Sequence, residues 1–190
     1  TDTNSGLVGP LVITAFGAAN DDGEPLDVQQ EIVLLMTVTD EGESYLLDRN
    51  IAHFIGSMSE QEKEDLLADG DFVESNLMHG FNGFLYGNNL LRPQLTAGKK
   101  TRVYGMALGT EVDMHSLRIS GHSLLVRQER RAQLNLMPGD VSEADILPTA
   151  GTWAILCHVN DHISAGMIGR IEVVESSLDD PLQVMKSSTT

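Results

Sequence analysis

Apolar and β-branched residues recur along the chain in short runs that are separated by polar turns. Runs of this length and composition are typical of β-strands. An Asn82-Gly83 pair between Phe81 and Phe84 adds a tight-turn signal, because both central positions of a type I′ turn need positive φ. The pattern predicts an all-β sandwich or barrel of about eight strands. The predicted strands are residues 11–16, 32–38, 101–108, 112–119, 123–127, 131–136, 145–147, 152–158 and 167–174.

Residues 59–68 interrupt this pattern and predict one short surface helix. Ser59 is followed three residues later by Glu62, which is the spacing of a capping box, and Gly70 ends the run. The strand pattern is expected to resume from Phe72.

The chain has 190 residues, which fits one domain, assigned here to residues 1–175 with a loosely held polar tail at 176–190. It carries 28 acidic and 12 basic residues, and the net charge of -16 argues against a nucleic-acid partner. No apolar run reaches the ~20 residues that span a bilayer. The acidic surplus has two interpretations, a solvated extracellular surface or carboxylates that bind a cation such as ferrous iron. The chain begins with Thr1, so we expect a piece of a longer protein.

The single cysteine, Cys157, excludes an internal disulfide and opens the most informative segment. His162 follows after five residues and Met167 after five more, which is the spacing of a blue-copper loop. Such a site uses one thiolate, two imidazoles and a weak axial thioether. His115, at the end of a predicted strand, is the candidate second imidazole. Taken singly, each residue could instead be core packing or a hydrogen-bonded loop histidine, whereas together their spacing favours copper.

Several motifs in one order resemble a known family. They are residues 4–11 (NSGLVGPL), 74–76 (ESN), 81–87 (FNGFLYG), 109–115 (GTEVDMH), 151–153 (GTW) and the loop 157–167. On these residues the chain resembles a cupredoxin-type domain of the ceruloplasmin and hephaestin family of multicopper oxidases, which are related to the A domains of coagulation factors. The resemblance implies a Greek-key β-sandwich, an even-numbered domain of a two-domain unit and an extracellular or secreted location.

The same resemblance implies a type 1 copper site with His115, Cys157, His162 and Met167 as ligands of one copper ion. It implies one-electron transfer in a ferroxidase-like oxidoreductase. The positions that match ligands of the family's trinuclear, oxygen-reducing cluster hold Arg118, Ser120, Leu156 and His158, of which only His158 could ligate. We therefore expect no reduction of dioxygen by this domain alone. The alternative function is a non-catalytic scaffold or interaction module, as in the coagulation relatives.

The remaining polar candidates are weaker. His158 is either a remnant of the missing pair or part of a metal site shared with a neighbouring domain. His122 is interpreted as structural, and His53 and His79 as surface or satisfied histidines. Asp161 is expected to orient the imidazole of a neighbouring ligand. The expected partners are a preceding or neighbouring cupredoxin domain or a second copy of the chain, with ferrous iron or another small electron donor.

Overall fold

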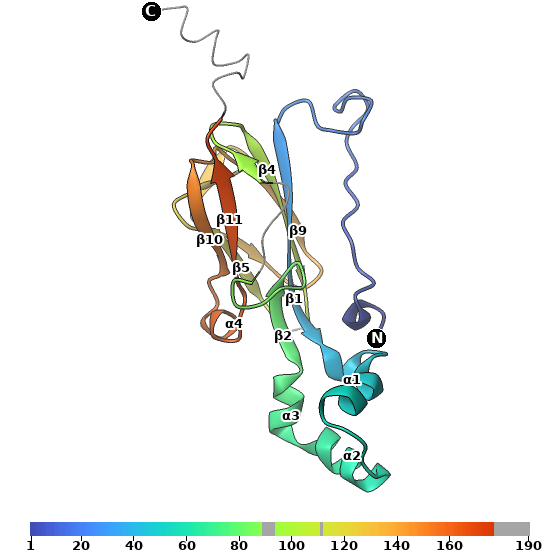
Figure 1. Cartoon of the computed structure of the whole chain (residues 1–190). Helices are drawn as coiled ribbons and strands as arrows, with labels where there is room; N and C mark the ends of the chain where they lie inside the picture. Colours follow the sequence, from blue (N-terminus) through green and yellow to red (C-terminus); the bar gives the residue numbers. More distant parts are fainter. Residues whose placement is uncertain (89–93, 111, 177–190) are drawn as a thin grey trace, which may run out of the picture.

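The protein is a two-layer β-sandwich, seen here in a computed structural model that describes residues 1–88, 94–110 and 112–176 (Figure 1). One sheet has six strands in the order β2-β1-β4-β9-β6-β7, and the other has five in the order β3-β11-β10-β5-β8. The described residues thus form a mostly β structure in two sheets, as predicted. The predicted tail at 176–190 lies almost wholly outside the described residues.

The six-stranded sheet contains the long strand β1, which lies second from its edge. Its members are β1 (Gln30–Asp40), β2 (Leu77–Phe81), β4 (Thr101–Leu108), β6 (Leu124–Val126), β7 (Glu129–Arg131) and β9 (Val141–Ile146). Strand β1 pairs antiparallel with β2 and parallel with β4. The predicted turn at Asn82-Gly83 is confirmed, with φ of 51° and 81° and a bridge between Phe81 and Phe84.

The five-stranded sheet carries the segments predicted to hold the site. Its members are β3 (Leu95–Thr96), β5 (His115–Ile119), β8 (Leu134–Leu136), β10 (Gly151–Cys157) and β11 (Ile168–Val174). The predicted strand at 112–119 begins only at His115, because the Asp113 carboxylate holds a turn by accepting from the backbone and hydroxyl of Thr110. The predicted strand at 131–136 is divided between β7 and β8, which belong to different sheets.

The predicted strand at 11–16 is wrong, since this segment pairs with no strand. Leu11 and Ile13 are 84% and 82% exposed, and the segment runs beside the six-stranded sheet without joining it (Figure 1). The segment lines a hollow with residues of β4 and β9. Both strands are already hydrogen-bonded on both edges, so the apolar run has no ladder to extend.

The predicted helix is confirmed, although the expectation of a single helix was incomplete. Helix α2 (Glu60–Ala68) starts at Ser59 with both hydrogen bonds of the capping box. The described residues also contain α1 (Leu47–Phe54), α3 (Gly70–Ser75) and α4 (Asn160–Ser164). Helix α3 replaces the strand expected from Phe72, because the Asp69 side chain caps the backbone amides of Asp71 and Phe72.

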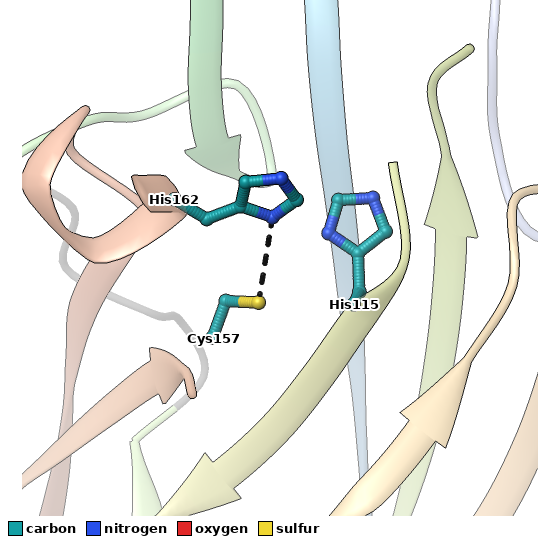
Figure 2. A group of neighbouring side chains, drawn as sticks. All are labelled: His115, Cys157 and His162. Atoms are coloured by element: carbon teal, nitrogen blue, oxygen red, sulfur yellow. Dashed lines mark hydrogen bonds between the residues drawn. The ribbon is translucent and has the colours of Figure 1, made fainter. Parts of the chain in front are cut away.

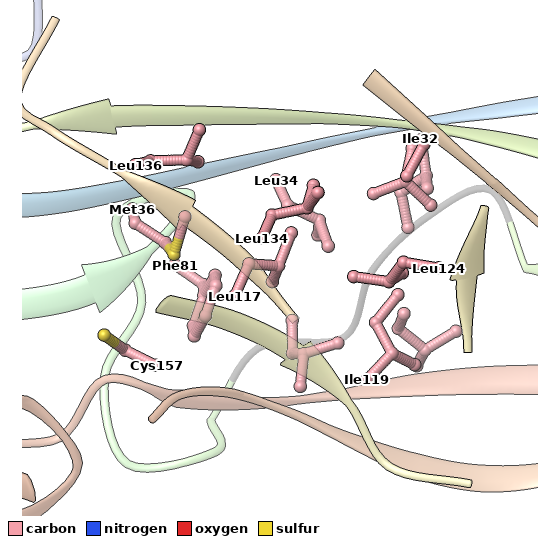
Figure 3. Packing of buried hydrophobic residues seen from close by; sticks show 14 of the residues in the cluster. Ile32, Leu34, Met36, Phe81, Leu117, Ile119, Leu124, Leu134, Leu136 and Cys157 are labelled. Atoms are coloured by element: carbon pink, nitrogen blue, oxygen red, sulfur yellow. The ribbon is translucent and has the colours of Figure 1, made fainter. Parts of the chain in front are cut away.

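The core fills the space between the two sheets. Figure 3 shows part of it, with aliphatic side chains from β1, β5, β6 and β8 meeting Phe81 of β2. Cys157, at the last position of β10, belongs to this cluster and is completely buried. The site predicted from the sequence therefore lies next to the hydrophobic core and shares Cys157 with it.

Candidate metal centre

Three donor side chains meet where β10 ends. His115 is the first residue of β5, Cys157 the last residue of β10, and His162 lies on α4. Their ligand atoms all lie within 4.8 Å of one another, and the Cys157 sulfur is 3.6 Å from Nδ1 of His162 (Figure 2). All three residues are buried. Among the described residues this is the group of histidine, cysteine and acidic side chains close enough to hold a metal ion.

His115 has one ring nitrogen that is satisfied and one that is not. Its Nε2 lies 3.0 Å from the carbonyl oxygen of Leu108. Because a carbonyl can only accept, Nε2 carries the proton and Nδ1 presents a lone pair. This Nδ1 is the one buried side-chain nitrogen or oxygen in the described part of the chain that has no hydrogen-bond partner. A buried lone pair without a donor is unusual, and a bound cation would satisfy it.

The Cys157 sulfur is held by a backbone donor. The amide of Ser116 donates to Sγ at 3.2 Å. Burial raises the pKa of the Cys157 thiol, while the Ser116 amide acts to lower it. In the metal-free chain the residue is therefore a thiol, and a metal ion must displace its proton on binding.

Both histidines are held in the form that binds metals. Burial lowers the pKa of His115, the bond to Leu108 opposes this, and the charge of His162 lowers it again. Burial also lowers the pKa of His162, and His79 adds to that effect. The neutral imidazole is thereby favoured at both positions.

The loop between Cys157 and Met167 is tied at both ends. The Cys157 amide donates to the Met167 carbonyl at 3.1 Å, and the Met167 amide donates to the His162 carbonyl at 2.7 Å. Gly166 turns the chain with a φ of 111° beneath the ring of Tyr86. Met167 is completely buried beside the other candidates, and its role as axial ligand stays a prediction.

His79, interpreted from the sequence as a surface or satisfied histidine, is a satisfied one, but its position beside His162 was not predicted. Its ring lies 5.1 Å from that of His162, it is buried, and its Nδ1 is 2.9 Å from the carbonyl oxygen of Leu77. It shares the inward face of β2 with Phe81, an alternation visible in the sequence. The contact with the loop after β10 joins distant segments, so local spacing could not reveal it.

The other singled-out residues have structural roles. His122 accepts from the Thr149 amide at 3.2 Å and packs edge-on against Trp153, as the structural interpretation predicted. His53 lies exposed on α1 beside Phe54. Asp161 acts on His162 by charge, which tends to raise the histidine pKa.

The acidic surplus is concentrated in two clusters, Asp21, Asp22, Glu24 and Asp27 and then Glu60, Glu62, Glu64 and Asp65, and both are occupied in part by local contacts. Asp27 forms an ion pair with Arg102 at 2.7 Å, and Glu24 accepts from the Asn20 amide. Glu62 belongs to the capping box of α2. None of these contacts assembles a cation site.

The outward positions of β5 and β10 have a different chemistry. Leu156 pairs with Arg118, and the Ser120 hydroxyl accepts from the Ala154 amide at 2.8 Å. His158 is exposed on this outer face. Of the four positions that match the family's trinuclear cluster, three thus hold a cation, a backbone-bound hydroxyl and a leucine, and the fourth is His158.

Comparison with known proteins agrees with this geometry. The chain is 36% identical over 174 residues to ferroxidase HEPHL1 of Mus musculus, and this match covers 90% of the chain. It is 40% identical over 169 residues to ceruloplasmin of Ovis aries, covering 87% of the chain, and 33% identical over 187 residues to human hephaestin, covering 97%. The chain is a homologue of the ceruloplasmin and hephaestin proteins.

This homologue of ceruloplasmin spans only 15–16% of the length of those relatives. No family model matches the chain. Among solved structures, a multicopper oxidase has a TM-score of 0.53 at 14% identity, covering 82% of this chain and 47% of its own. The copper nitrite reductase of Nitrosomonas europaea has a TM-score of 0.51 at 16% identity, covering 83% of this chain and 55% of its own. These structures confirm the cupredoxin-like fold. Across the described residues, no helix is long and apolar enough to cross a bilayer.

Proposed function

We propose that this ceruloplasmin homologue is an electron-transfer domain that binds one type 1 copper ion. The ligands are His115, Cys157 and His162, with Met167 as the axial thioether. The observation that carries the proposal is the buried, unpartnered Nδ1 of His115, which shares a 4.8 Å group with the Cys157 sulfur and a His162 nitrogen. One thiolate, two imidazoles and one thioether are the donor set of a blue-copper site.

When bound, copper would supply a one-electron redox couple. The chain's own residues prepare the site for it. The Leu108 carbonyl fixes the His115 tautomer, so that a lone pair faces the other donors. The Ser116 amide donates to the Cys157 sulfur and stabilises its negative charge once the proton has left. Burial of all three donors excludes water and keeps the imidazoles neutral.

We further propose that the domain works within a larger ferroxidase-like protein outside the cell. The chain matches about one sixth of the length of each of these relatives, and one of them is named a ferroxidase. A neighbouring cupredoxin domain, or a second copy of this chain, is the proposed partner, and ferrous iron is the proposed electron donor. Light scattering on the isolated chain separates the partners, since a strict monomer at high concentration argues against the second copy.

An absorption spectrum tests the copper proposal. We expect the copper-free chain, after addition of one equivalent of Cu(II), to develop an intense band toward the red end of the visible spectrum. Such a band comes from charge transfer between thiolate and copper. Stoichiometrically bound copper without that band would contradict a type 1 site and would favour the scaffold alternative.

A further inference from the structure

We propose that Met114, Met137 and His158 form a second metal site, on the outer face of the five-stranded sheet, for a soft monovalent cation such as Cu(I). It lies on the opposite side of β5 and β10 from the buried donor group. The proposal does not depend on the type 1 site, because it shares no side chain with it.

The two methionines are brought together by strand pairing. His115 on β5 pairs with Leu136 on β8, and both side chains are buried. Met114 lies one residue before β5 and Met137 one residue after β8, and the alternation of the two strands, continued by one residue, points both side chains outward. They are 51% and 49% exposed, as this alternation requires. The antiparallel register of β5 and β8 ends at the pair His115 and Leu136, and extending it by one residue places Met114 opposite Met137.

His158 joins them from the other side of β5. Cys157 pairs with Leu117, and the His158 amide donates to the Ser116 carbonyl at 2.7 Å. His158 therefore lies opposite Ser116, two residues along β5 from Met114, on the same outward face. Diagonal neighbours of this kind are about 7–8 Å apart, which is within reach of long side chains. His158 and Met137 follow the ends of the two strands that flank β5, and Met114 lies between them on the same outward face.

The chemistry of these donors selects the ion. Thioethers are soft, uncharged ligands that favour Cu(I), and imidazole also suits copper. Arg118 lies on the same face, two residues beyond Ser116, and its positive charge opposes a divalent cation more strongly than a monovalent one. The site should therefore discriminate against Zn(II), Fe(II) and Ca(II).

Titration with Ag(I), a redox-inert substitute for Cu(I), tests the proposal. A variant with both Cys157→Ser and Met167→Leu lacks the thiol and the thioether proposed for the buried site, and we expect it to bind one Ag(I) with His158, Met114 and Met137. Adding Met114→Leu and Met137→Leu should weaken that binding at least tenfold, whereas Met58→Leu, in the loop between α1 and α2, should leave it within twofold. Leucine keeps the side-chain volume, so folding should be retained.

Methyl NMR of the unsubstituted chain gives an independent measurement. Ag(I) should shift the methyl signals of Met114 and Met137 and leave Met58 in place. Unshifted signals, or equal Ag(I) affinity after both leucine substitutions, would overturn the proposal. Since the blue absorption band reports only on the buried donors, the two proposals can fail separately.

Discussion

The two faces of β5 and β10 carry different kinds of side chain at neighbouring positions of the same strands. On the inward face, His115 and Cys157 are completely buried and share a compact donor group with His162. On the outward face, the neighbouring positions hold Arg118 and Leu156, paired across the same two strands. Because side chains alternate along a strand, each face can be built independently of the other. The presence of a buried donor group on one face therefore does not determine what the opposite face holds, and the two faces can be tested separately.

Replacing the inward thiol should have the largest effect. Cys157→Ser is expected to abolish the red absorption band of the copper-loaded chain completely, because the charge-transfer donor is gone. Serine is close to cysteine in size, and burying its hydroxyl should cost about 1–3 kcal/mol of folding free energy. Circular dichroism checks that the sheet persists. The matched outward change, Leu156→Ala on the same strand, should keep the band, and its loss there would show that the faces are coupled.

Oxygen consumption tests whether the outward face supports the reduction of dioxygen. The copper-loaded chain should accept one electron from ferrous iron or ascorbate and then reoxidise slowly in air. Dioxygen needs four electrons to form water, and Arg118 repels a cupric ion where the family's cluster would lie. An oxygen electrode with excess reductant measures this. Sustained enzymatic uptake that disappears in His158→Ala would instead reveal a second centre that uses His158 across a subunit interface.

The same contrast explains how far the sequence could be interpreted. The spacing from Cys157 to His162 predicted the donors that the structure brings together, because only four residues of one loop separate them and limit their distance. The strand at 101–108 agrees with β4 at both ends, since its buried and half-buried positions alternate strictly. Both are local patterns, which the chain itself encodes.

Non-local relations could not be predicted in the same way. Residues 11–16 have strand composition but lie beside a strand whose two edges are filled. The approach of His79 to His162 depends on how β2 and the loop after β10 are placed in space. Neither relation corresponds to a local pattern of residue spacing in the sequence.

The loop that closes the inward face should be sensitive to Gly166→Ala. Gly166 has a φ of 111°, and an added Cβ would lie 3.0 Å from two carbons of the Tyr86 ring. Gly139→Ala is the matched control, because Gly139 has a φ of 87° with nothing within 4 Å. Both changes strain the backbone, so each should cost about 1–3 kcal/mol. Gly166→Ala should cost about 1 kcal/mol more because of the contact, measured by urea unfolding. Equal costs would mean that Tyr86 simply moves aside.

The smallest effect is a pH dependence of the copper-free chain that arises from the inward face. Burial holds the pKa of His115 and of His162 below the usual 6.5, with His79 adding to this at His162 and Asp113 and Asp161 opposing it.

The unfolded chain therefore binds protons first as the pH falls below about 6.5, and the free energy of unfolding should decrease from there downward. At the alkaline side the sign reverses. The pKa of the Cys157 thiol lies above its usual 9.0, so the unfolded chain loses its proton first and stability should decrease as the pH rises above about 9. Urea unfolding across this range measures both slopes. His115→Gln should flatten the acid slope and Cys157→Ser the alkaline one. An acid slope that survives His115→Gln and His162→Gln together would place its origin outside the buried donor group.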